Sequence, residues 1–328
     1  MKSFEWVEAT TLAEALTALE RPGAMPLAGG VDLLDRMKEH LEAPSRLVSL
    51  RKLPGLDAIA VAGGEARIGA RVTLAQLASD PGLRASHPIV GDAAGHAATP
   101  QLRAMATLGG NLAQRPRCWY FRSELFACKK KGGLTCFAQH GDNELHAIYN
   151  NRTCAAPHPS TIAPALVALG ARVQIAMPGG KAREVELATF FVAPDTDVTR
   201  EVELAPGELI TGVTVPAVAA NVRTAYTKEV AKQSFDWPIV DVAVALALDG
   251  TRCKQATIVL GAVAPGPLRA TVAERALEGK QIDERTARAA AAAMVSTATP
   301  LAENRFKVPV LEAVIARTII AAATGRTP

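Results

Sequence analysis

The sequence predicts an α/β protein followed by a smaller α+β domain at its C-terminal end. Short aliphatic runs alternate with helical patterns up to about residue 216, and a Gly-Gly turn joins a strand to a helix near residue 30. Beyond that point long apolar strands are followed by alanine-rich helices. With 328 residues and 49% hydrophobic content, the chain is long enough for two or three packed subdomains.

The net charge and the two ends of the chain carry little functional information. A formal charge of +4 does not by itself suggest a nucleic-acid partner. The first residues, MKSFEWVEATT, lack the apolar core of a signal peptide, and the apolar stretch at 311–324 is interrupted by Glu312 and Arg317. We therefore expect no membrane span and a cytoplasmic protein; the alternative is a periplasmic protein exported together with a partner subunit.

A strand, a glycine turn and a helix are predicted near the N-terminus. Thr11 and Glu14 form a capping box for a first amphipathic helix that stops at 21–23, Arg-Pro-Gly. The run MPLA at 25–28 predicts a strand that leads into Gly-Gly. Apolar residues then recur at helical spacing as far as Met37, and this second helix is expected to end near Pro44.

Further strands and one hairpin are predicted before residue 217. Aliphatic runs at 46–50, 58–61 and 66–70 predict strands, and the last of them opens a strand-plus-helix unit. ARVQIAM and REVEL, joined by Pro-Gly-Gly, predict a hairpin. We expect a domain over 1–217, with subdomains at about 1–60 and 61–217 and a cysteine-rich insertion at 115–156.

The C-terminal domain is predicted over 218–328. The runs IVDVAVALAL and ATIVLGAVA have the continuous apolar character of buried strands. The segments DERTARAAAAAMVSTA and VLEAVIARTIIAAAT predict helices that cover them.

Two glycine-rich segments are candidates for binding a phosphate group. Glycine lets the backbone approach a ligand closely, and the helix that follows offers its N-terminal N–H groups. The alternative is a purely structural turn in each case, since neither segment has the Walker or GxGxxG spacing. The candidate residues are Leu27, Ala28, Gly29, Gly30, Val31, Asp32 and Leu33 in the first segment and Thr107, Gly109, Gly110, Asn111 and Leu112 in the second.

Four of the five cysteines are candidate metal ligands, because they cluster after the second glycine segment. They are Cys118, Cys128, Cys136 and Cys154. Thiolates are the ligands of iron–sulfur clusters, whereas zinc usually takes CxxC pairs, which are absent here. The cations and aromatic residues around them offer a different interpretation, a zinc-stabilised nucleic-acid surface. We favour the cluster, whose negative charge nearby cations would offset, and we interpret Cys253 as a buried apolar residue.

No catalytic residue stands out in the sequence. A nucleophile elbow, an HExxH pair and an EF-hand loop are all missing. The chemistry is therefore expected to come from a bound cofactor, with the protein supplying orientation and electrostatics.

The chain resembles the FAD-binding subunits of the xanthine dehydrogenase and carbon monoxide dehydrogenase family in the order of four motifs. These motifs are AGGVDLLDRMK, IGARVTL, TPQLRAMATLGGNL and APHPSTIAPALVALGA. The resemblance covers essentially the whole chain, including YTKEVAKQSFDWPIVDVAVALAL and LGAVAPGPLRA near the C-terminus. It implies a two-part FAD-binding domain of the PCMH type and a smaller α+β domain. The four cysteines are similar to those of bacterial aldehyde oxidoreductase flavin subunits that carry a [4Fe-4S] cluster.

The resemblance also implies roles for individual residues. The two glycine segments would contact FAD, together with Thr161, and Ile210 and Lys228 would lie near the isoalloxazine. The four cysteines would ligate the cluster. Two positions depart from the family pattern, since Val31 replaces a usual threonine and Thr161 a usual aspartate.

By the same resemblance, the chain would be one subunit of an oxidoreductase complex. A large molybdenum-cofactor subunit would oxidise the substrate, most simply an aldehyde, and a small subunit with two [2Fe-2S] centres would pass electrons through this FAD to an external acceptor. The alternatives are a complex that is similar to 4-hydroxybenzoyl-CoA reductase or xanthine dehydrogenase, and a free-standing flavoenzyme of the same fold.

Overall fold

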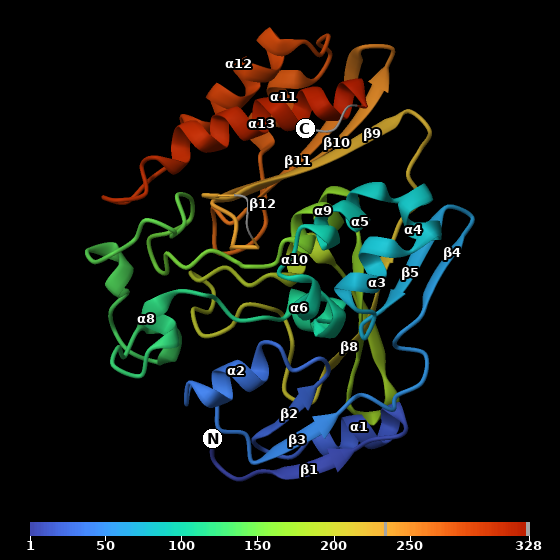
Figure 1. The fold of residues 1–328 in the computed structure, drawn as a ribbon, viewed down its shortest axis with the longest axis vertical. Coiled ribbons are helices and arrows are strands. Elements are labelled where there is room, and N and C mark those ends of the chain that lie inside the picture. The colour runs from blue at the N-terminus through green and yellow to red at the C-terminus, as the bar shows by residue number, and fades with distance from the viewer. Residues whose placement is uncertain (233–234, 326–328) are drawn as a thin grey trace.

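The computed structural model describes residues 1–232 and 235–325. Gln233 and Ser234, which belong to the motif YTKEVAKQSFDWPIVDVAVALAL, therefore lie outside the described residues. The described chain contains three sheets, of three, five and four strands. In Figure 1 the three-stranded sheet lies at the bottom, the five-stranded sheet above it and the four-stranded sheet with its helices at the top. This arrangement confirms the predicted α/β fold with a separate C-terminal α+β part.

The N-terminal unit is a parallel sheet in the order β1-β3-β2. The central strand, β3, is buried along its whole length, while Pro26 is accommodated because β2 is an edge strand. The predicted capping box at Thr11 and Glu14 is present at the start of α1. The elements are β1 (Glu5–Glu8), α1 (Leu12–Leu19), β2 (Ala24–Leu27), α2 (Leu33–Lys38) and β3 (Arg46–Ser49).

The second unit is built on an antiparallel sheet in the order β4-β5-β8-β6-β7. The predicted hairpin is confirmed as β6 and β7. The strands are β4 (Ile59–Ala62), β5 (Glu65–Gly69), β6 (Arg172–Ala176), β7 (Ala182–Glu186) and β8 (Leu209–Val215). The helices are α3 (Leu74–Ser79), α4 (Pro81–Ser86), α5 (Pro88–Gly95), α6 (Pro100–Met105), α7 (Leu108–Leu112), α9 (Ile162–Ala168), α10 (Leu187–Phe190) and the short 3-10 turn η3 (Pro178–Gly180).

The C-terminal unit is an antiparallel sheet in the order β12-β11-β10-β9. Its inner strand β10 is apolar from Val242 to Leu248, because α13 covers one face while α9 of the second unit packs on the other. The strands are β9 (Val222–Glu229), β10 (Val240–Asp249), β11 (Arg252–Gly261) and β12 (Leu268–Arg269). The helices are α11 (Thr271–Leu277), α12 (Glu284–Val295) and α13 (Lys307–Thr324).

The cysteine-rich segment has little regular structure. It contains α8 (Trp119–Arg122) and two 3-10 turns, η1 (Lys129–Lys131) and η2 (Phe137–Gln139). In Figure 1 it lies between α2 and the C-terminal helices. A small aromatic core around Tyr120, with Phe126 and Phe137, holds it together.

Three local predictions need correction. The second helix ends at Lys38, well before Pro44. The second glycine segment, for which a structural turn was the alternative, is not a turn: Gly109 and Gly110 lie inside the short helix α7, which Thr107 caps. The last helix begins earlier than predicted, at Lys307, because Pro309 falls in its first turn, where a missing N–H costs nothing.

Candidate functional site

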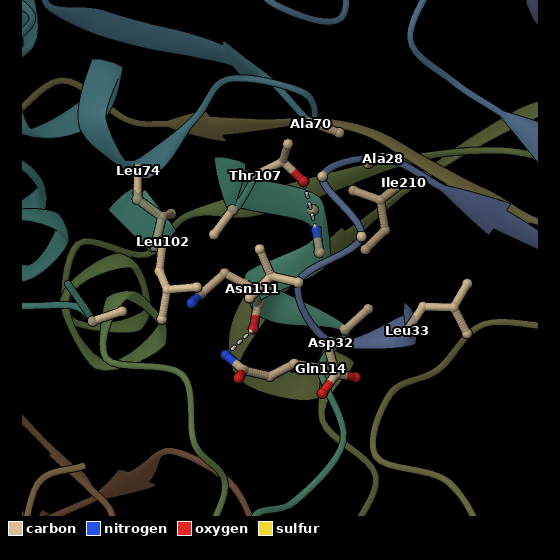
Figure 2. A pocket seen from close by; sticks show the side chains of 18 of the residues that line it. Ala28, Asp32, Leu33, Ala70, Leu74, Leu102, Thr107, Asn111, Gln114 and Ile210 are labelled. Atoms are coloured by element: carbon tan, nitrogen blue, oxygen red, sulfur yellow. Dashed lines mark hydrogen bonds between the residues drawn. The ribbon is translucent and has the colours of Figure 1, made fainter. Parts of the chain in front are cut away.

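A single cavity of about 600 Å³ lies between the three units and collects most of the predicted site residues. The first glycine segment, α7 and Thr161 line it, and so do Ile210 and Lys228. Figure 2 shows Ala28, Asp32, Thr107, Asn111 and Ile210 around this space. Leu112 is the exception, since it is buried in the hydrophobic core and does not line the cavity.

The two glycine segments, far apart in the sequence, are packed directly against neighbouring backbone. A Cβ at Gly29 would lie 1.8 Å from the carbonyl oxygen of Met105, at the end of α6, so no larger residue fits there. Gly30 has φ of +75°, which favours glycine as well. A Cβ at Gly109 would lie 3.1 Å from the Cβ of Ala70. Both segments are therefore shaped for a close backbone approach.

Two short helices begin at the cavity wall, α2 at Leu33 and α7 at Leu108. The first turn of α2 provides backbone N–H groups of the kind that bind phosphate oxygens. In α7 the corresponding groups are used within the chain, since Leu108, Gly109 and Asn111 donate to the carbonyl oxygens of Val72, Ala70 and Thr107. The Thr107 hydroxyl caps α7 by accepting a hydrogen bond from the Gly110 N–H at 3.3 Å. Gln114 donates to the Asn111 carbonyl at 2.9 Å, and both bonds are drawn in Figure 2.

Thr161 has a buried hydroxyl at the cavity wall. It is 3% exposed, and its Oγ1 has no hydrogen-bond partner among the described residues. A buried hydroxyl without a partner is costly, so this atom is suited to receive a bond from a ligand.

Asp32 lines the cavity, but its carboxylate is occupied by arginines. Oδ1 accepts from Arg117 at 2.9 Å and Arg122 at 2.7 Å, and Oδ2 accepts from Arg36 at 3.0 Å. Burial raises the pKa of this carboxyl, but the charges of the three guanidinium groups outweigh it and hold the pKa below its ordinary value. Asp32 thus joins α2 to the cysteine-rich segment.

The end of the cavity near Lys228 carries residues that sequence reasoning missed. The Lys228 ammonium donates to the carbonyl oxygens of His96 at 2.9 Å and Asp236 at 2.6 Å. Arg117 stacks over the Trp237 ring at 4.9 Å, and both residues line the cavity. The sequence around Arg117 gave no signal for this contact, because Trp237 lies on a loop of a different unit.

The four predicted cysteines line one small space of about 20 Å³. The Cys154 thiol interacts with Cys136, which lowers the pKa of Cys136 and raises that of Cys154. The His146 ring lies 3.2 Å from the Cys118 sulfur. Within the described residues, no three or more His, Cys, Asp or Glu side chains are arranged as a metal site. The four-thiol donor set suits an iron–sulfur cluster, but the sulfur positions do not form a coordination polyhedron.

The cations of this segment mostly face carboxylates of the same chain. Lys130 and Arg115 pair with Glu201 at 2.6 and 2.7 Å, and Arg122 pairs with Glu39 at 3.1 Å. These internal ion pairs do not support the interpretation of the segment as a nucleic-acid surface, because nucleic acid requires cations that are available to phosphate groups. Cys253 is fully buried in the C-terminal core, as predicted.

Comparison with known proteins connects this geometry to a family. The family described as FAD binding domain in molybdopterin dehydrogenase matches residues 2–218, and the family described as CO dehydrogenase flavoprotein C-terminal domain matches residues 225–322. The chain belongs to the FAD-binding subunits of the molybdenum hydroxylase family. These subunits are parts of oxidoreductases, which confirms the predicted enzyme class.

Individual relatives of this FAD-binding subunit match over nearly their whole length. It is 37% identical to the aldehyde oxidoreductase FAD-binding subunit PaoB of Escherichia coli (strain K12), over 94% of each chain. It is 29% identical to the carbon monoxide dehydrogenase medium chain of Afipia carboxidovorans, over 92% of this chain and 89% of that one. The solved quinoline 2-oxidoreductase from Pseudomonas putida 86 superposes with a TM-score of 0.78 at 26% identity, covering 100% of both chains.

The cavity of this FAD-binding subunit fits a flavin dinucleotide in its chemistry. The glycines let the two segments pack closely at one cavity wall, where the start of α2 offers backbone N–H groups to a pyrophosphate, and the Thr161 hydroxyl is unpaired in the described structure. No helix in the described part of the chain has the length and apolar character needed to cross a bilayer.

Proposed function

We propose that this chain is the FAD-carrying electron-transfer subunit of a heteromeric molybdenum hydroxylase. The observation that carries the proposal is that two distant glycine segments wall one cavity together with an unpaired buried hydroxyl, in a chain of the FAD-binding family. When bound, the flavin accepts and releases electrons; the protein positions it.

The contacts to FAD would come from four places. Leu27 to Leu33 would hold the pyrophosphate and ribityl chain through backbone N–H groups, and α7 would contact them through its residues that line the cavity. The Thr161 hydroxyl would supply one further polar contact. Ile210 of β8 and Lys228 of β9 would lie against the isoalloxazine, since both line the cavity.

Electrons would enter from partner subunits. The names of the relatives, FAD-binding subunit and medium chain, indicate complexes of several chains. A large molybdenum-cofactor subunit would oxidise the substrate, and a small subunit with two [2Fe-2S] centres would pass electrons through FAD to an external acceptor. The substrate proposed for the complex is an aldehyde, which the 37% identity to PaoB supports. A complex similar to 4-hydroxybenzoyl-CoA reductase or xanthine dehydrogenase is the alternative.

We also propose that Cys118, Cys128, Cys136 and Cys154 bind a [4Fe-4S] cluster. The support is the shared space that all four line, together with Lys130, which lines the same space and acts electrostatically on Cys154. The cytoplasmic compartment and the domain division at 1–217 and 218–328 stay predictions.

The test is an anaerobic visible spectrum with flavin, iron and zinc quantification on the purified chain. Wild type should show flavin bands and a broad iron–sulfur absorbance, and Cys128→Ala should lose the iron but retain the flavin. Cys253→Ala is the matched control, because it removes a buried thiol outside the segment. A colourless protein with one zinc and no flavin would contradict the proposal, and substrate turnover by the isolated chain would instead support a free-standing flavoenzyme.

A further inference from the structure

Asp241 is a buried carboxyl that the proposed function does not use. It is 1% exposed on β10, and its Oδ1 has no hydrogen-bond partner among the described residues. In the sheet it lies directly opposite Lys228 of β9 on one side and Gly261 of β11 on the other. Side chains directly opposite one another in a sheet share a face, so Asp241 and Lys228 lie on the same side.

The packing leaves room for this carboxyl group and little else. A Cβ at Gly261 would lie 1.7 Å from the Asp241 Oδ1 and 2.8 Å from Pro164 of α9. The position opposite Asp241 must therefore be glycine. The Tyr226 hydroxyl lies close enough to act on the carboxyl as a hydrogen-bonding group, but Oδ1 itself has no partner among the described residues. Because an incompletely paired buried carboxyl is costly, a site that retains one usually has a functional reason for it.

Several charged and titratable groups face Asp241 from the elements that pack around it. Tyr226 and Lys228 come from β9 and Lys307 from the start of α13, while α9 has none. His96, at the end of α5, has its ring 6.1 Å from that of Tyr226, and Asp236 and Arg103 act on Lys228. Burial raises the pKa of Asp241 to about 7, against the influence of Tyr226, Lys228 and Lys307.

Lys228 connects this carboxyl to the cavity. It lines the cavity, and two carbonyl oxygens hold its ammonium group in place. Burial lowers the pKa of Lys228, and the negative charge of Asp241 acts in the opposite direction. The net charge of the pair therefore depends on whether Asp241 carries a proton.

We propose that Asp241 is a positioning residue for the flavin site, which gains or loses a proton and so sets the net positive charge that Lys228 presents to the cavity. The proposal rests on the proposed function, since it needs the isoalloxazine near Lys228. Two-electron reduction of a flavin with uptake of one proton leaves one added negative charge, and an uncompensated Lys228 favours that charge. The proton on Asp241 comes from water and returns to it, and the electrons come from the external reductant.

The test measures the flavin midpoint potential against pH by spectroelectrochemical titration of the FAD-loaded chain. In wild type the potential should fall more steeply through about pH 7 than on either side of it. Asp241→Asn should lack this steeper region and have a more positive potential than wild type above it, with no difference below it. Asp249→Asn is the matched control, since Asp249 is an exposed residue of the same strand that pairs with Lys254 at 3.1 Å.

A second pair of variants tests the route through Lys228. The single variant Lys228→Gln should also lack the steeper region. The double variant Lys228→Gln/Asp241→Asn should have the same midpoint potential as Lys228→Gln alone. A steeper region that persists in Asp241→Asn, or an equal shift in both backgrounds, would overturn the proposal. If Asp241→Asn does not fold, Lys228→Gln alone tests the proposal, because a steeper region that persists in Lys228→Gln would also overturn it.

Thermal unfolding of the FAD-free chain separates the inference from the proposed function. Asp241→Asn should lose stability less steeply than wild type as the pH rises toward about 7, because the folded state holds its proton longer than the unfolded state. If the chain binds flavin but its midpoint potential is the same in Asp241→Asn as in wild type, only the inference is overturned. A wild-type chain that binds no flavin would overturn both.

Discussion

Gly29 shows how one residue controls the shape of the cavity. Its missing side chain allows the first glycine segment to lie against the end of α6, where a Cβ would be 1.8 Å from the Met105 carbonyl oxygen. An added methyl group must push one segment away from the other and so widen the cradle for the cofactor.

We expect Gly29→Ala to weaken FAD binding by about tenfold or more, the size of a typical overpacking penalty. Flavin fluorescence titration of the apoprotein measures the dissociation constant. Gly95→Ala is the control, because a Cβ there meets only Ala78 at 3.9 Å. Equal affinities for both variants and wild type would show that the cofactor lies elsewhere.

Thr161 gives a second prediction at the residue scale. Since its hydroxyl has no partner in the described structure, Thr161→Val should leave the free energy of unfolding of the FAD-free chain unchanged or slightly raised. Its FAD affinity should fall severalfold, about 1 kcal/mol for one lost hydrogen bond. Chemical denaturation with and without FAD checks both effects, and a destabilised apoprotein with unchanged affinity would contradict the ligand contact.

At the scale of elements, the ion pairs of Asp32 connect α2 with the segment around α8. Its carboxylate accepts hydrogen bonds from Arg36 of α2 itself and from Arg117 and Arg122 of the cysteine-rich segment. Its removal would leave Arg117 facing Asp35 at 3.9 Å and would weaken the compensation of Arg36 and Arg122, which retain Glu42 and Glu39. Loss of such a buried network is more costly than the loss of an exposed pair.

We expect Asp32→Asn to lower the free energy of unfolding by about 3 kcal/mol at neutral pH. The depressed pKa of Asp32 means that this contribution is present above the ordinary carboxyl pKa of 3.8 and is lost as the pH falls through the lower folded value. Urea unfolding at neutral and acidic pH measures the difference. Asp92→Asn is the control, because Asp92 forms only an exposed pair with Arg84 at 3.9 Å; a similar effect of both variants would argue against the connecting role.

At the scale of the whole molecule, buried histidine makes stability sensitive to acid. His158 is 4% exposed and lies against the Phe191 ring at 4.7 Å. Burial, with a further effect of Lys130, lowers its pKa to about 3. The folded chain thus keeps this ring neutral at a pH where the unfolded chain protonates it.

Stability should therefore fall as the pH drops below the ordinary histidine value of 6.5, and this decrease continues to about pH 3. Between pH 7 and pH 5 we expect His158 alone to account for about 2 kcal/mol. Thermal unfolding of His158→Gln should show a weaker pH dependence over this range. His140→Gln, at an exposed position, should retain the wild-type dependence, and an unchanged slope in His158→Gln would contradict the assignment.

The sequence by itself determined the elements whose signals are local. The capping box at Thr11, the β6–β7 hairpin and the apolar strand β10 follow from residues within a few positions of one another. The edge strand β1 and the polar strand β9 were missed, because their strand conformation comes from pairing with distant partners.

How the distant segments combine depends on the packing of the whole chain. This packing brings both glycine segments and Lys228 to one cavity, turns Asp32 toward arginines, and buries Asp241 beside Tyr226 with its Oδ1 lacking a hydrogen-bond partner among the described residues. The reason is physical: hydrogen bonds and burial act between atoms close in space, and the neighbours of Asp241 come from positions as far away in sequence as Lys307. Local patterns specify helices and strands, whereas the charge and shape of the site depend on which of them are packed together.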